Sequence, residues 1–395
     1  MENVYDTIVL GVGAAGSATV YQLAKRNNKV LGLDQFSPPH TYGSSHGGTR
    51  ITRKAIGEGL EYTPITLRSY EIWREIEKET GMKLLQITGG LIMSSKSGKS
   101  YKANFFKSTV EAAKMYNIPH EILNATEIRR RFPQFIVKDD EVGYYEYDAG
   151  FLRPEECIKA NLMLAKKYGA QIHLNEKVTN FEERNGLVYV NTNRNNYVAK
   201  KLIVSAGAWL PGFFRDEFKH IFAVCRQVMY WFDVKNGEIE NYLPGKFPIF
   251  IWELPVNSNG LYGFPSIDGP YGGVKVASHQ FKITSTPDSM EREVTEDEIK
   301  EMYSTYVKPY FSNLTEKCVK AVSCLYTMTP DKGFIIDKHP NYNNIILASP
   351  CSGHGFKHSA AIGEILAQLA TQGKTTLDIS KFSISRFCKY SYFIL

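Results

Sequence analysis

The segment Ile8-Val-Leu-Gly-Val-Gly-Ala-Ala-Gly16 decides the fold of this chain. It begins in a short β-branched run, residues 6–10, and continues into a stretch rich in helix formers, residues 14–26. A G-x-G-x-x-G turn between a strand and a helix permits a tight turn, close approach of a pyrophosphate to the backbone and close packing of the helix. The segment therefore predicts the start of a dinucleotide-binding β-α-β unit.

The second strand of this unit, residues 30–33, ends at Asp34. A carboxylate at this position can accept hydrogen bonds from ribose hydroxyls, and the N-terminus of the preceding helix favours phosphate. These features do not distinguish NAD from FAD, although their position near residue 1 favours FAD. An NAD-dependent dehydrogenase stays open as the alternative.

Apolar runs and turn residues predict further elements. Helical patterns cover 61–80, parts of 101–132, 154–168, 287–305 and 356–369. Strand-like runs cover 84–94, 171–174, 187–192, 202–208, 224–232, 249–254, 261–264, 273–277 and 345–348. The run 202–208 is a strand that enters a tight turn, so we assign it to the nucleotide unit despite its distance in sequence. The prediction is an α/β protein in which 1–88, 150–216 and 318–395 bind FAD, with a mixed-sheet substrate domain of 89–149 and 217–317 inserted.

The composition excludes several classes of protein. The 395 residues are 43% hydrophobic and 22% charged, which allows a large core and is unlike a disordered chain. The net charge of +6 is not concentrated in basic runs, so we expect no nucleic-acid partner. The six cysteines include no C-x-x-C pair, and we expect neither a disulfide scaffold nor a metal.

The chain also lacks the patterns of exported and membrane proteins. The N-terminus is polar, and no apolar run approaches the roughly 20 residues of a membrane span. The last residues match neither a retention signal nor a peroxisomal signal. We therefore expect a cytoplasmic protein with no membrane partner.

Basic residues follow the nucleotide unit in Gly43-Ser-Ser-His-Gly-Gly-Thr-Arg-Ile-Thr-Arg53. This segment can be a flexible loop with a solvated basic turn, or it can lie along the cofactor. Its two arginines are three residues apart, and a guanidinium is the natural bidentate partner of a carboxylate. Lys275 lies in the strand-like run 272–277, where alternation allows either an inward or an outward side chain.

Two downstream segments complete the pattern. Cys324 lies in Ala321-Val-Ser-Cys-Leu-Tyr-Thr-Met-Thr-Pro-Asp331, and Cys351-Ser-Gly-His-Gly-Phe-Lys357 forms a second glycine turn with a cation. A cysteine alone would be interpreted as a small buried hydrophobe. Together with the nucleotide turn, the two segments indicate a flavin held at both ends, with a covalent link as one interpretation.

The chain resembles a known family along nearly its whole length. The matching segments are Pro38–His46, Gly47–Arg53, Gly57–Gly59, Tyr262–Pro265, Cys324–Thr327, Phe334–Asp337 and Ser352–Lys357. They are similar to those of the flavoprotein family of monomeric sarcosine oxidase and N-methyltryptophan oxidase, within the D-amino-acid-oxidase-like superfamily. The resemblance implies a Rossmann-like FAD-binding domain of the glutathione-reductase type.

The resemblance also implies roles for individual residues. Cys324 matches the cysteine that forms a thioether to the flavin 8α-methyl group, and Lys357 and Arg53 match the cations that hold the substrate carboxylate. Lys275 matches the lysine near flavin N5 that activates oxygen. Arg50 and His46 match residues packed against the flavin, and His279, Tyr262 and Tyr326 match residues of the substrate cavity. The implied catalytic residues are Lys275, Arg50, His46, His279 and Tyr262; the implied substrate-binding residues are Arg53, Lys357, Tyr326 and Tyr262. The implied cofactor-binding residues are Gly11, Val12, Gly13, Ala14, Ala15, Gly16, Asp34, Gln35, His46, Thr49, Arg50, Val178, Cys324, Gly353, His354, Gly355, Phe356 and Lys357.

The activity implied by the resemblance is oxidation of an N-methyl amino acid, such as sarcosine, by a monomeric FAD enzyme. The products would be the primary amino acid, formaldehyde and hydrogen peroxide, with oxygen as the electron acceptor. A bulkier N-methyl, cyclic or primary amino acid is the alternative substrate, and a non-enzymatic flavin-binding protein is the alternative class. Three residues depart from the family pattern, Gly48, Cys225 and Cys351, and they leave the substrate side chain open.

Overall fold

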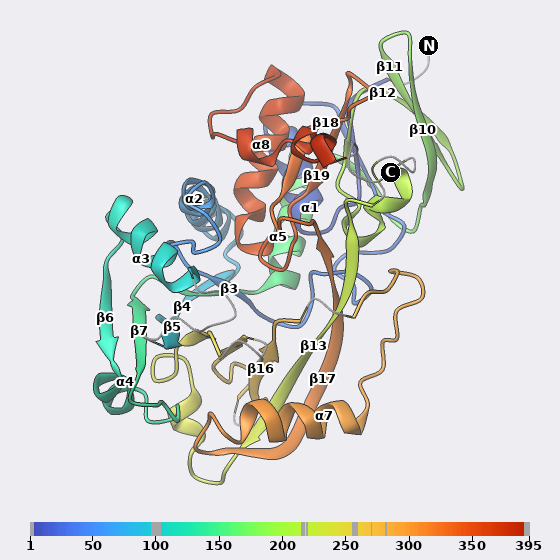
Figure 1. The fold of residues 1–395 in the computed structure, drawn as a ribbon. Helices are drawn as coiled ribbons and strands as arrows, with labels where there is room; N and C mark the ends of the chain where they lie inside the picture. The colour runs from blue at the N-terminus through green and yellow to red at the C-terminus, as the bar shows by residue number, and fades with distance from the viewer. Residues whose placement is uncertain are drawn as a thin grey trace.

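Two large β-sheets, joined by a small one, form the frame of the molecule in Figure 1. The computed structural model describes residues 4–95, 104–214, 218, 220–254, 260–269, 271–280 and 283–390. Both large sheets have eight strands, and the small one has three. No helix of this described part is long and apolar enough to cross a bilayer.

The first sheet contains the predicted nucleotide unit. Its parallel strands, in spatial order, are β9 (Gln171–His173), β2 (Val30–Leu33), β1 (Tyr5–Leu10), β12 (Asn196–Val204) and β19 (Ile345–Ser349). Antiparallel strands β10 (Val178–Arg184), β11 (Leu187–Thr192) and β18 (Ile335–Lys338) extend it. The pairing of β1 with β12 confirms that residues 202–204 belong beside the N-terminal strand. The central strands β1, β2 and β19 are mostly apolar and buried, as expected when helices cover a parallel sheet.

Helices from three distant parts of the chain pack together on this sheet. They are α1 (Ala14–Lys25), α5 (Pro154–Lys167) and α8 (Ser359–Gln372), with α2 (Tyr62–Thr80) against α8. A Cβ atom at Gly363 of α8 would lie 2.5 Å from the backbone of Ala18, so glycine is required for the close approach of α8 to α1. Contacts between sequence-distant helices thus hold the nucleotide unit in one piece.

The second sheet is mixed. Its strands, in spatial order, are β17 (Leu314–Met328), β13 (Ala223–Val234), β16 (Val274–Ser278), β15 (Leu261–Phe264), β14 (Ile249–Trp252), β5 (Gly90–Ser95), β7 (Glu141–Glu146) and β6 (His120–Asn124). Only the pairing of β14 with β5 is parallel among these neighbouring strands of the described chain. The third sheet contains β3 (Arg50–Thr52), β8 (Gly150–Leu152) and β4 (Leu85–Ile87). The α/β class with a parallel nucleotide sheet and a mixed second sheet is as predicted.

The division into an FAD-binding domain and a substrate domain stays a prediction. Most strands of each sheet fall within the ranges that we assigned to it. β17 pairs with β13 of the mixed sheet over almost its whole length, and it includes residues 318–328, which we assigned to the FAD-binding domain. This strand therefore connects the two parts.

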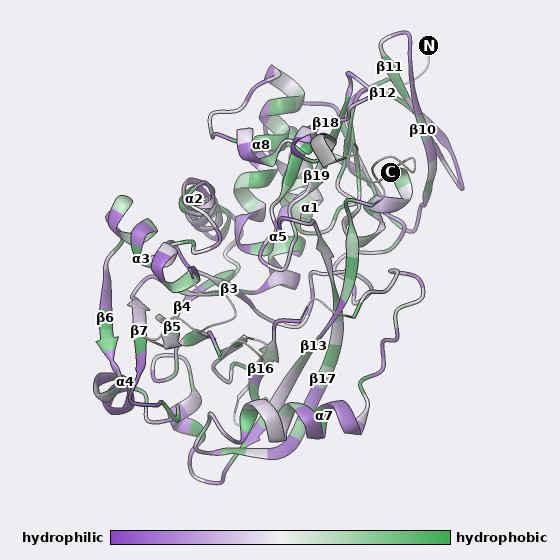
Figure 2. Ribbon diagram, in the orientation of Figure 1, coloured by the Kyte–Doolittle hydropathy of each residue, from purple (hydrophilic) through white to green (hydrophobic). Residues whose placement is uncertain are grey.

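Several elements differ from those predicted. The acidic segment 287–305 is helical only in α7 (Glu296–Met302) and a π-turn over Tyr303–Val307. Thr295 starts α7 because it forms a capping box with Glu298. Figure 2 shows α7 as mostly hydrophilic, which explains why an amphipathic period could not set its start.

The predicted strand 84–94 is two strands, because Gly89 has a positive φ of 72° and breaks the run. Within 101–132 we expected helices and loops, and the structure has α3 (Phe105–Met115), β6 and α4 (Ala125–Arg131). Residues 101–103 lie outside the described part. Strands β6, β7, β8 and β10 were not predicted. β8 acquires its partners β3 and β4 only from distant segments. By contrast, β10 forms a local hairpin with β11 across Asn185-Gly186, a turn signal that the sequence analysis did not use.

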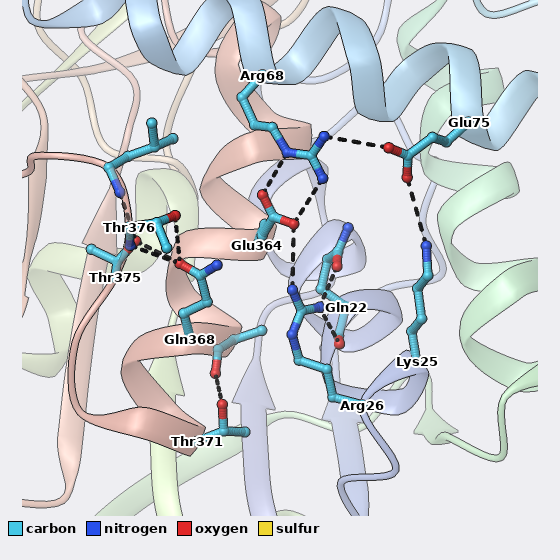
Figure 3. A network of polar contacts seen from close by, with 12 residues as sticks. Gln22, Lys25, Arg26, Arg68, Glu75, Glu364, Gln368, Thr371, Thr375 and Thr376 are labelled. Atoms are coloured by element: carbon cyan, nitrogen blue, oxygen red, sulfur yellow. Dashed lines mark hydrogen bonds and ion pairs between the residues drawn. The ribbon is translucent and has the colours of Figure 1, made fainter.

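An ion-pair network ties α1, α2 and α8 together (Figure 3). The carboxylate of Glu364 on α8 accepts hydrogen bonds from Arg68 Nε at 2.8 Å and Nη2 at 3.0 Å, and it lies 3.4 Å from Arg26 Nη2. The Glu364 side chain is only 13% exposed. One largely buried carboxylate therefore bridges Arg68 of α2 and Arg26 at the C-terminal end of α1.

Replacement of Glu364 by glutamine should destabilise the fold by about 1–2 kcal/mol, because two partly buried guanidinium groups lose their shared anion. Urea unfolding would measure the change. Glu75→Gln is the matched control, since Glu75 pairs with Arg68 at 3.3 Å but is 46% exposed, and its loss should cost at most about 0.5 kcal/mol. Equal effects of both substitutions would contradict the bridging role.

This stabilisation should depend on pH. The hydrogen bond from Arg68 and its charge hold the pKa of Glu364 below its usual range. The folded pKa is thus depressed, so the contribution is present above the unfolded pKa and is lost as pH falls through the folded one. The difference in stability between wild type and Glu364→Gln should shrink below about pH 4.

Candidate active site

A cavity of about 610 Å³ lies between the two large sheets, and most of the residues singled out from the sequence line it. The lining includes the predicted residues Gly11, Gly13, Ala14, Ala15, Asp34, Gln35, Arg50, Arg53, Val178, Tyr262, His279, Cys324, Tyr326, Gly353, His354, Gly355, Phe356 and Lys357. Five other predicted residues, Val12, Gly16, His46, Thr49 and Lys275, are not part of the lining. They lie behind it, and their contacts are described below.

The nucleotide turn forms one end of the cavity. The two carboxylate oxygens of Asp34 accept hydrogen bonds from the backbone N–H groups of Val12 and Phe36, both at 2.9 Å. Burial raises the pKa of Asp34 to about 6, although these two hydrogen bonds oppose the shift. The carboxylate is thus fixed at the end of β2, beside the start of α1.

The first turn of α1 is open to the cavity. Its N-cap is Gly13, no side chain caps it, and a Cβ atom at Gly13 would meet no atom within 4 Å. The N–H groups of a helix start without a side-chain cap favour an anion such as phosphate. By contrast, a Cβ atom at Gly16 would lie 1.7 Å from the carbonyl oxygen of Gly11, so Gly16 serves packing of the turn.

The second glycine turn also lines the cavity. A Cβ atom at Gly355 would lie 1.6 Å from the carbonyl oxygen of Pro350, so only glycine fits there. This close turn brings Lys357 to the start of α8, where its side chain is only 6% exposed. The N-terminal turn and this turn are more than 300 residues apart in sequence and face one cavity.

The two cations assigned to the substrate carboxylate lie close together and are buried. Arg53 is 1% exposed, and Lys357 is 5% exposed. Glu58 lies between them, with its carboxylate 2.7 Å from Arg53 Nη2 and 3.9 Å from Lys357 Nζ. Lys357 Nζ also donates to the carbonyl oxygen of His354 at 2.7 Å. With two cations and one carboxylate, the cluster carries a net positive charge at the cavity wall.

The structure turns the side chain of Lys275 inward. Lys275 is 2% exposed, and its Nζ donates to the carbonyl oxygens of Gly47 at 2.9 Å and Thr49 at 3.0 Å, and to Thr49 Oγ1 at 3.1 Å. The rings of Trp231 and Phe264 lie 5.2 and 4.6 Å from the ammonium. Burial and the charge of Arg50 hold the pKa of Lys275 well below its usual range.

Arg50 lines the cavity in front of this lysine. Its guanidinium donates to the carbonyl oxygens of Thr49 at 2.8 Å and Ser44 at 2.7 Å. His46 is buried behind it, and its Nε2 has no hydrogen-bond partner among the residues that the structure describes. Burial and then Arg50 lower the pKa of His46 to about 3, so its imidazole is neutral at physiological pH.

The wall that the mixed sheet contributes carries Tyr262, His279, Cys324 and Tyr326. The hydroxyl groups of Tyr262 and Tyr326 are 3.4 Å apart, and the Tyr262 and His279 rings are 4.8 Å apart. Burial, followed by the nearby thiol, raises the pKa of Tyr262 to about 12, so it stays protonated. Cys324 is 2% exposed, and burial raises the pKa of its thiol.

The three departures from the family pattern differ in position. Cys351 lines the cavity, so two thiols, Cys324 and Cys351, contribute to its wall. Cys225 is buried in β13 opposite Tyr326. Gly48 has a positive φ of 78°, and its N–H donates to Glu155. The departures therefore lie near the site.

Sequence reasoning missed two carboxylates at this site. Glu58 lies in the Gly57–Gly59 segment, which is one of the segments that carry the resemblance. Its position between two glycines, shortly after Arg53, was the signal that could have indicated it. Glu155 accepts hydrogen bonds from Gly47 and Gly48 across 108 and 107 residues of chain. No local pattern indicates such a contact. Acidic residues are common in the first turn of a helix, so Glu155 does not stand out in the sequence.

Comparison with known proteins defines the class. The family model described as FAD dependent oxidoreductase matches residues 6–369. The chain therefore belongs to the FAD dependent oxidoreductase family. This result sets aside the NAD-dependent dehydrogenase and the non-enzymatic alternatives.

Individual proteins are similar to this chain over nearly its whole length. A monomeric sarcosine oxidase from Bacillus sp. (strain B-0618) is 40% identical over 391 residues, which are 98% of this chain and 97% of the relative. An N-methyl-L-tryptophan oxidase from Yersinia pestis (strain Pestoides F) is 33% identical over 388 residues, 97% of this chain and 99% of the relative. The solved structure of NikD, an amino acid oxidase of nikkomycin biosynthesis, has a TM-score of 0.82 at 21% identity and covers 97% of this chain and 98% of its own. This last similarity concerns the fold alone.

The residues present fit FAD. The uncapped start of α1 suits the pyrophosphate, and Asp34 suits a ribose. Within the described part of the chain, Nε2 of buried His46 is a donor or acceptor site beside Arg50 that has no partner. These features span one cavity, as a long dinucleotide cofactor requires.

Proposed function

We propose that this protein oxidises an N-methyl amino acid, such as sarcosine, to the primary amino acid, formaldehyde and hydrogen peroxide, with oxygen as the acceptor. The observation that carries the proposal is the buried cluster of Arg53, Lys357 and Glu58, whose net positive charge suits one carboxylate. The sarcosine oxidase named above supports the same substrate class.

The protein supplies binding, orientation and charge. FAD, when bound, would accept a hydride from the methyl carbon and pass the electron pair to oxygen, and the released imine would hydrolyse in water. Arg53 and Lys357 would hold the carboxylate by charge-assisted hydrogen bonds. Tyr262, His279 and Tyr326 would enclose the amine and exclude water. Lys275, charged and buried, would favour the negative charge that develops as oxygen is reduced.

A bulkier N-methyl, cyclic or primary amino acid is the alternative substrate. The N-methyl-L-tryptophan oxidase named above supports it, because this relative covers almost the same length of chain. The cluster of cations would bind the carboxylate of either substrate. The part of the cavity that holds the substrate side chain would therefore determine which amino acid is oxidised. Turnover of sarcosine, N-methyl-tryptophan, proline and glycine by one preparation separates the alternatives.

Sarcosine should be turned over much faster than dimethylamine. The two compounds share the methylamine group, but only sarcosine carries a carboxylate for Arg53 and Lys357. Losing one charge-assisted interaction at a buried site costs about 2–3 kcal/mol, or roughly 30- to 150-fold in kcat/KM. Oxygen consumption with each compound is the measurement. Equal kcat/KM values would exclude the cluster as a carboxylate site.

The flavin is expected to be bound covalently through Cys324. In Cys324→Ala, flavin should leave the protein on acid denaturation, whereas in wild type it should stay with the precipitate. Cys351→Ala is the matched control, because Cys351 also lines the cavity and its loss should leave the link intact. Flavin absorbance of the pellet and of the supernatant shows whether the flavin stays attached to the protein. Release only from Cys351→Ala would assign the link to Cys351.

The oligomeric state and the compartment stay predictions. We expect a cytoplasmic monomer. Sedimentation of the holoenzyme measures the oligomeric state, and localisation in the source cell identifies the compartment.

A further inference from the structure

Glu155 lies beside the cavity and has no part in the reaction described so far. It is in the first turn of α5, directly after Pro154. Its Oε1 accepts hydrogen bonds from the N–H groups of Gly47 at 2.6 Å and Gly48 at 3.1 Å, and its Oε2 lies 3.3 Å from the latter. One carboxylate thus fixes two successive N–H groups of the 47–49 loop.

The same loop holds the ammonium of Lys275. The carbonyl oxygen of Gly47 accepts from Lys275 Nζ at 2.9 Å, and Thr49 accepts through its carbonyl and its hydroxyl. Gly47 therefore binds Glu155 with its N–H and Lys275 with its C=O. A carboxylate of α5 and an ammonium of β16 are thus connected through one residue of backbone.

Charge complementarity adds to this geometry. The charged and titratable groups that act on Lys275 are Arg50, Lys320, Cys324 and Glu155. Two of them are cations, and His46, which lies nearby, is neutral. Burial raises the pKa of Glu155, but the N–H groups of Gly48 and Gly47 and the charge of Arg50 outweigh it, so the net shift is downward. Glu155 is therefore an anion close to the buried ammonium of Lys275 and the partly buried guanidinium of Arg50.

We infer that Glu155 is a positioning residue for Lys275: it fixes the 47–49 loop that holds the ammonium, and it supplies the negative charge that keeps the ammonium protonated. The inference deepens the proposed function and rests on it for the role of Lys275 in oxygen reduction. Glu155 itself need touch neither substrate nor cofactor. Glu155 acts on Lys275 through its hydrogen bond to Gly47 and through the electrostatic field of its carboxylate.

The test uses Glu155→Gln in the holoenzyme, with Glu156→Gln as the matched control. Glu156 is the next residue in the same helical turn, is 38% exposed and pairs with Lys159, so its loss removes the same charge from outside the site. The flavin is reduced photochemically without oxygen and then mixed with oxygen in a stopped-flow instrument. No amine is used, so the result does not depend on the proposed substrate.

Reoxidation should slow about tenfold or more in Glu155→Gln and stay unchanged in Glu156→Gln. The pH dependence gives a sharper readout. Reoxidation requires protonated Lys275, so its rate falls as pH rises through the pKa of Lys275. Removing the Glu155 charge lowers that pKa, and the fall should move to lower pH by roughly one unit. Glu155→Asp, which keeps the charge, should leave this midpoint in place.

Amide hydrogen exchange provides a readout that needs no activity and no bound cofactor. Exchange at Gly47 and Gly48 should be about tenfold faster or more in Glu155→Gln than in Glu156→Gln, because their acceptor becomes a weaker amide oxygen. Three results would each overturn the inference: unchanged exchange at these amides, an unchanged reoxidation midpoint in Glu155→Gln, or equal shifts in the Gln and Asp variants. If sarcosine is not a substrate but the midpoint moves, the inference holds and the proposed function fails.

Discussion

Reoxidation of the reduced enzyme by oxygen should slow about a hundredfold or more in Lys275→Met, whereas anaerobic reduction of the flavin by substrate should change much less. Lys275 is almost fully buried, and three oxygen atoms hold its ammonium in place. A fixed cation in such a site acts at a lower dielectric than in water. Loss of one preorganised group of this kind commonly costs about 3 kcal/mol, which is roughly 150-fold in rate.

The pH dependence of reoxidation follows from the same lysine. Burial and Arg50 lower its pKa, so the ammonium loses its proton at a lower pH than an exposed lysine would. The wild-type rate should therefore be high below this lowered pKa and fall as pH rises through it. Lys275→Met should show a slow rate without this fall.

Lys320→Met is the matched control for Lys275→Met. Lys320 lies over the same Trp231 ring, 4.9 Å from its centre, but its side chain is exposed. The same substitution there should change reoxidation by less than about twofold, since solvent screens an exposed charge. Equal losses in both half-reactions of Lys275→Met would mean that Lys275 shapes the whole cavity. An unchanged reoxidation rate would place the oxygen site elsewhere, and Arg50 would be the next candidate.

Lys357→Met should lower kcat/KM for sarcosine about a hundredfold, mainly by raising KM. The substitution leaves Arg53 and Glu58 as an ion pair at 2.7 Å with no net charge, so a substrate carboxylate loses its attraction to the site. Truncation of one partner of a buried charged pair costs about 2–5 kcal/mol. Steady-state kinetics with sarcosine and with dimethylamine measure the effect. Turnover of dimethylamine should be nearly unchanged, because it has no carboxylate.

Glu58→Gln should act in the opposite direction. It removes the carboxylate that competes with substrate for Arg53 and Lys357, so carboxylate ligands such as acetate should bind more tightly, by about tenfold. Titration of the flavin spectrum with acetate provides the measurement. Weaker acetate binding in Glu58→Gln would show that Glu58 holds the two cations in place and does not compete for them.

The candidate site could be predicted from sequence where motifs are local or long. Gly16 and Gly355 are required by close contacts with the backbone of Gly11 and Pro350, each five residues away, so the glycines alone reveal these two turns. Cys324 and Arg53 were singled out from their segments, and the resemblance implied their roles. The direction of Lys275 was left open, because alternation in a strand does not say which face of a sheet is covered. Glu58 and Glu155 were missed, since their partners are set by the fold.

The sequence by itself determined the β-α-β unit, the α/β class and the family. Glycine geometry, β-branched runs and helix starts depend on only a few neighbouring residues, so they can be recognised in the sequence. The tertiary structure decided which groups are charged and where. It buries Lys275 in the mixed sheet, connects it through Gly47 to Glu155 more than 100 residues away, and inserts Glu58 between Arg53 and Lys357. Burial and contact with distant charges control the pKa of each group, and neither exists until the chain has folded.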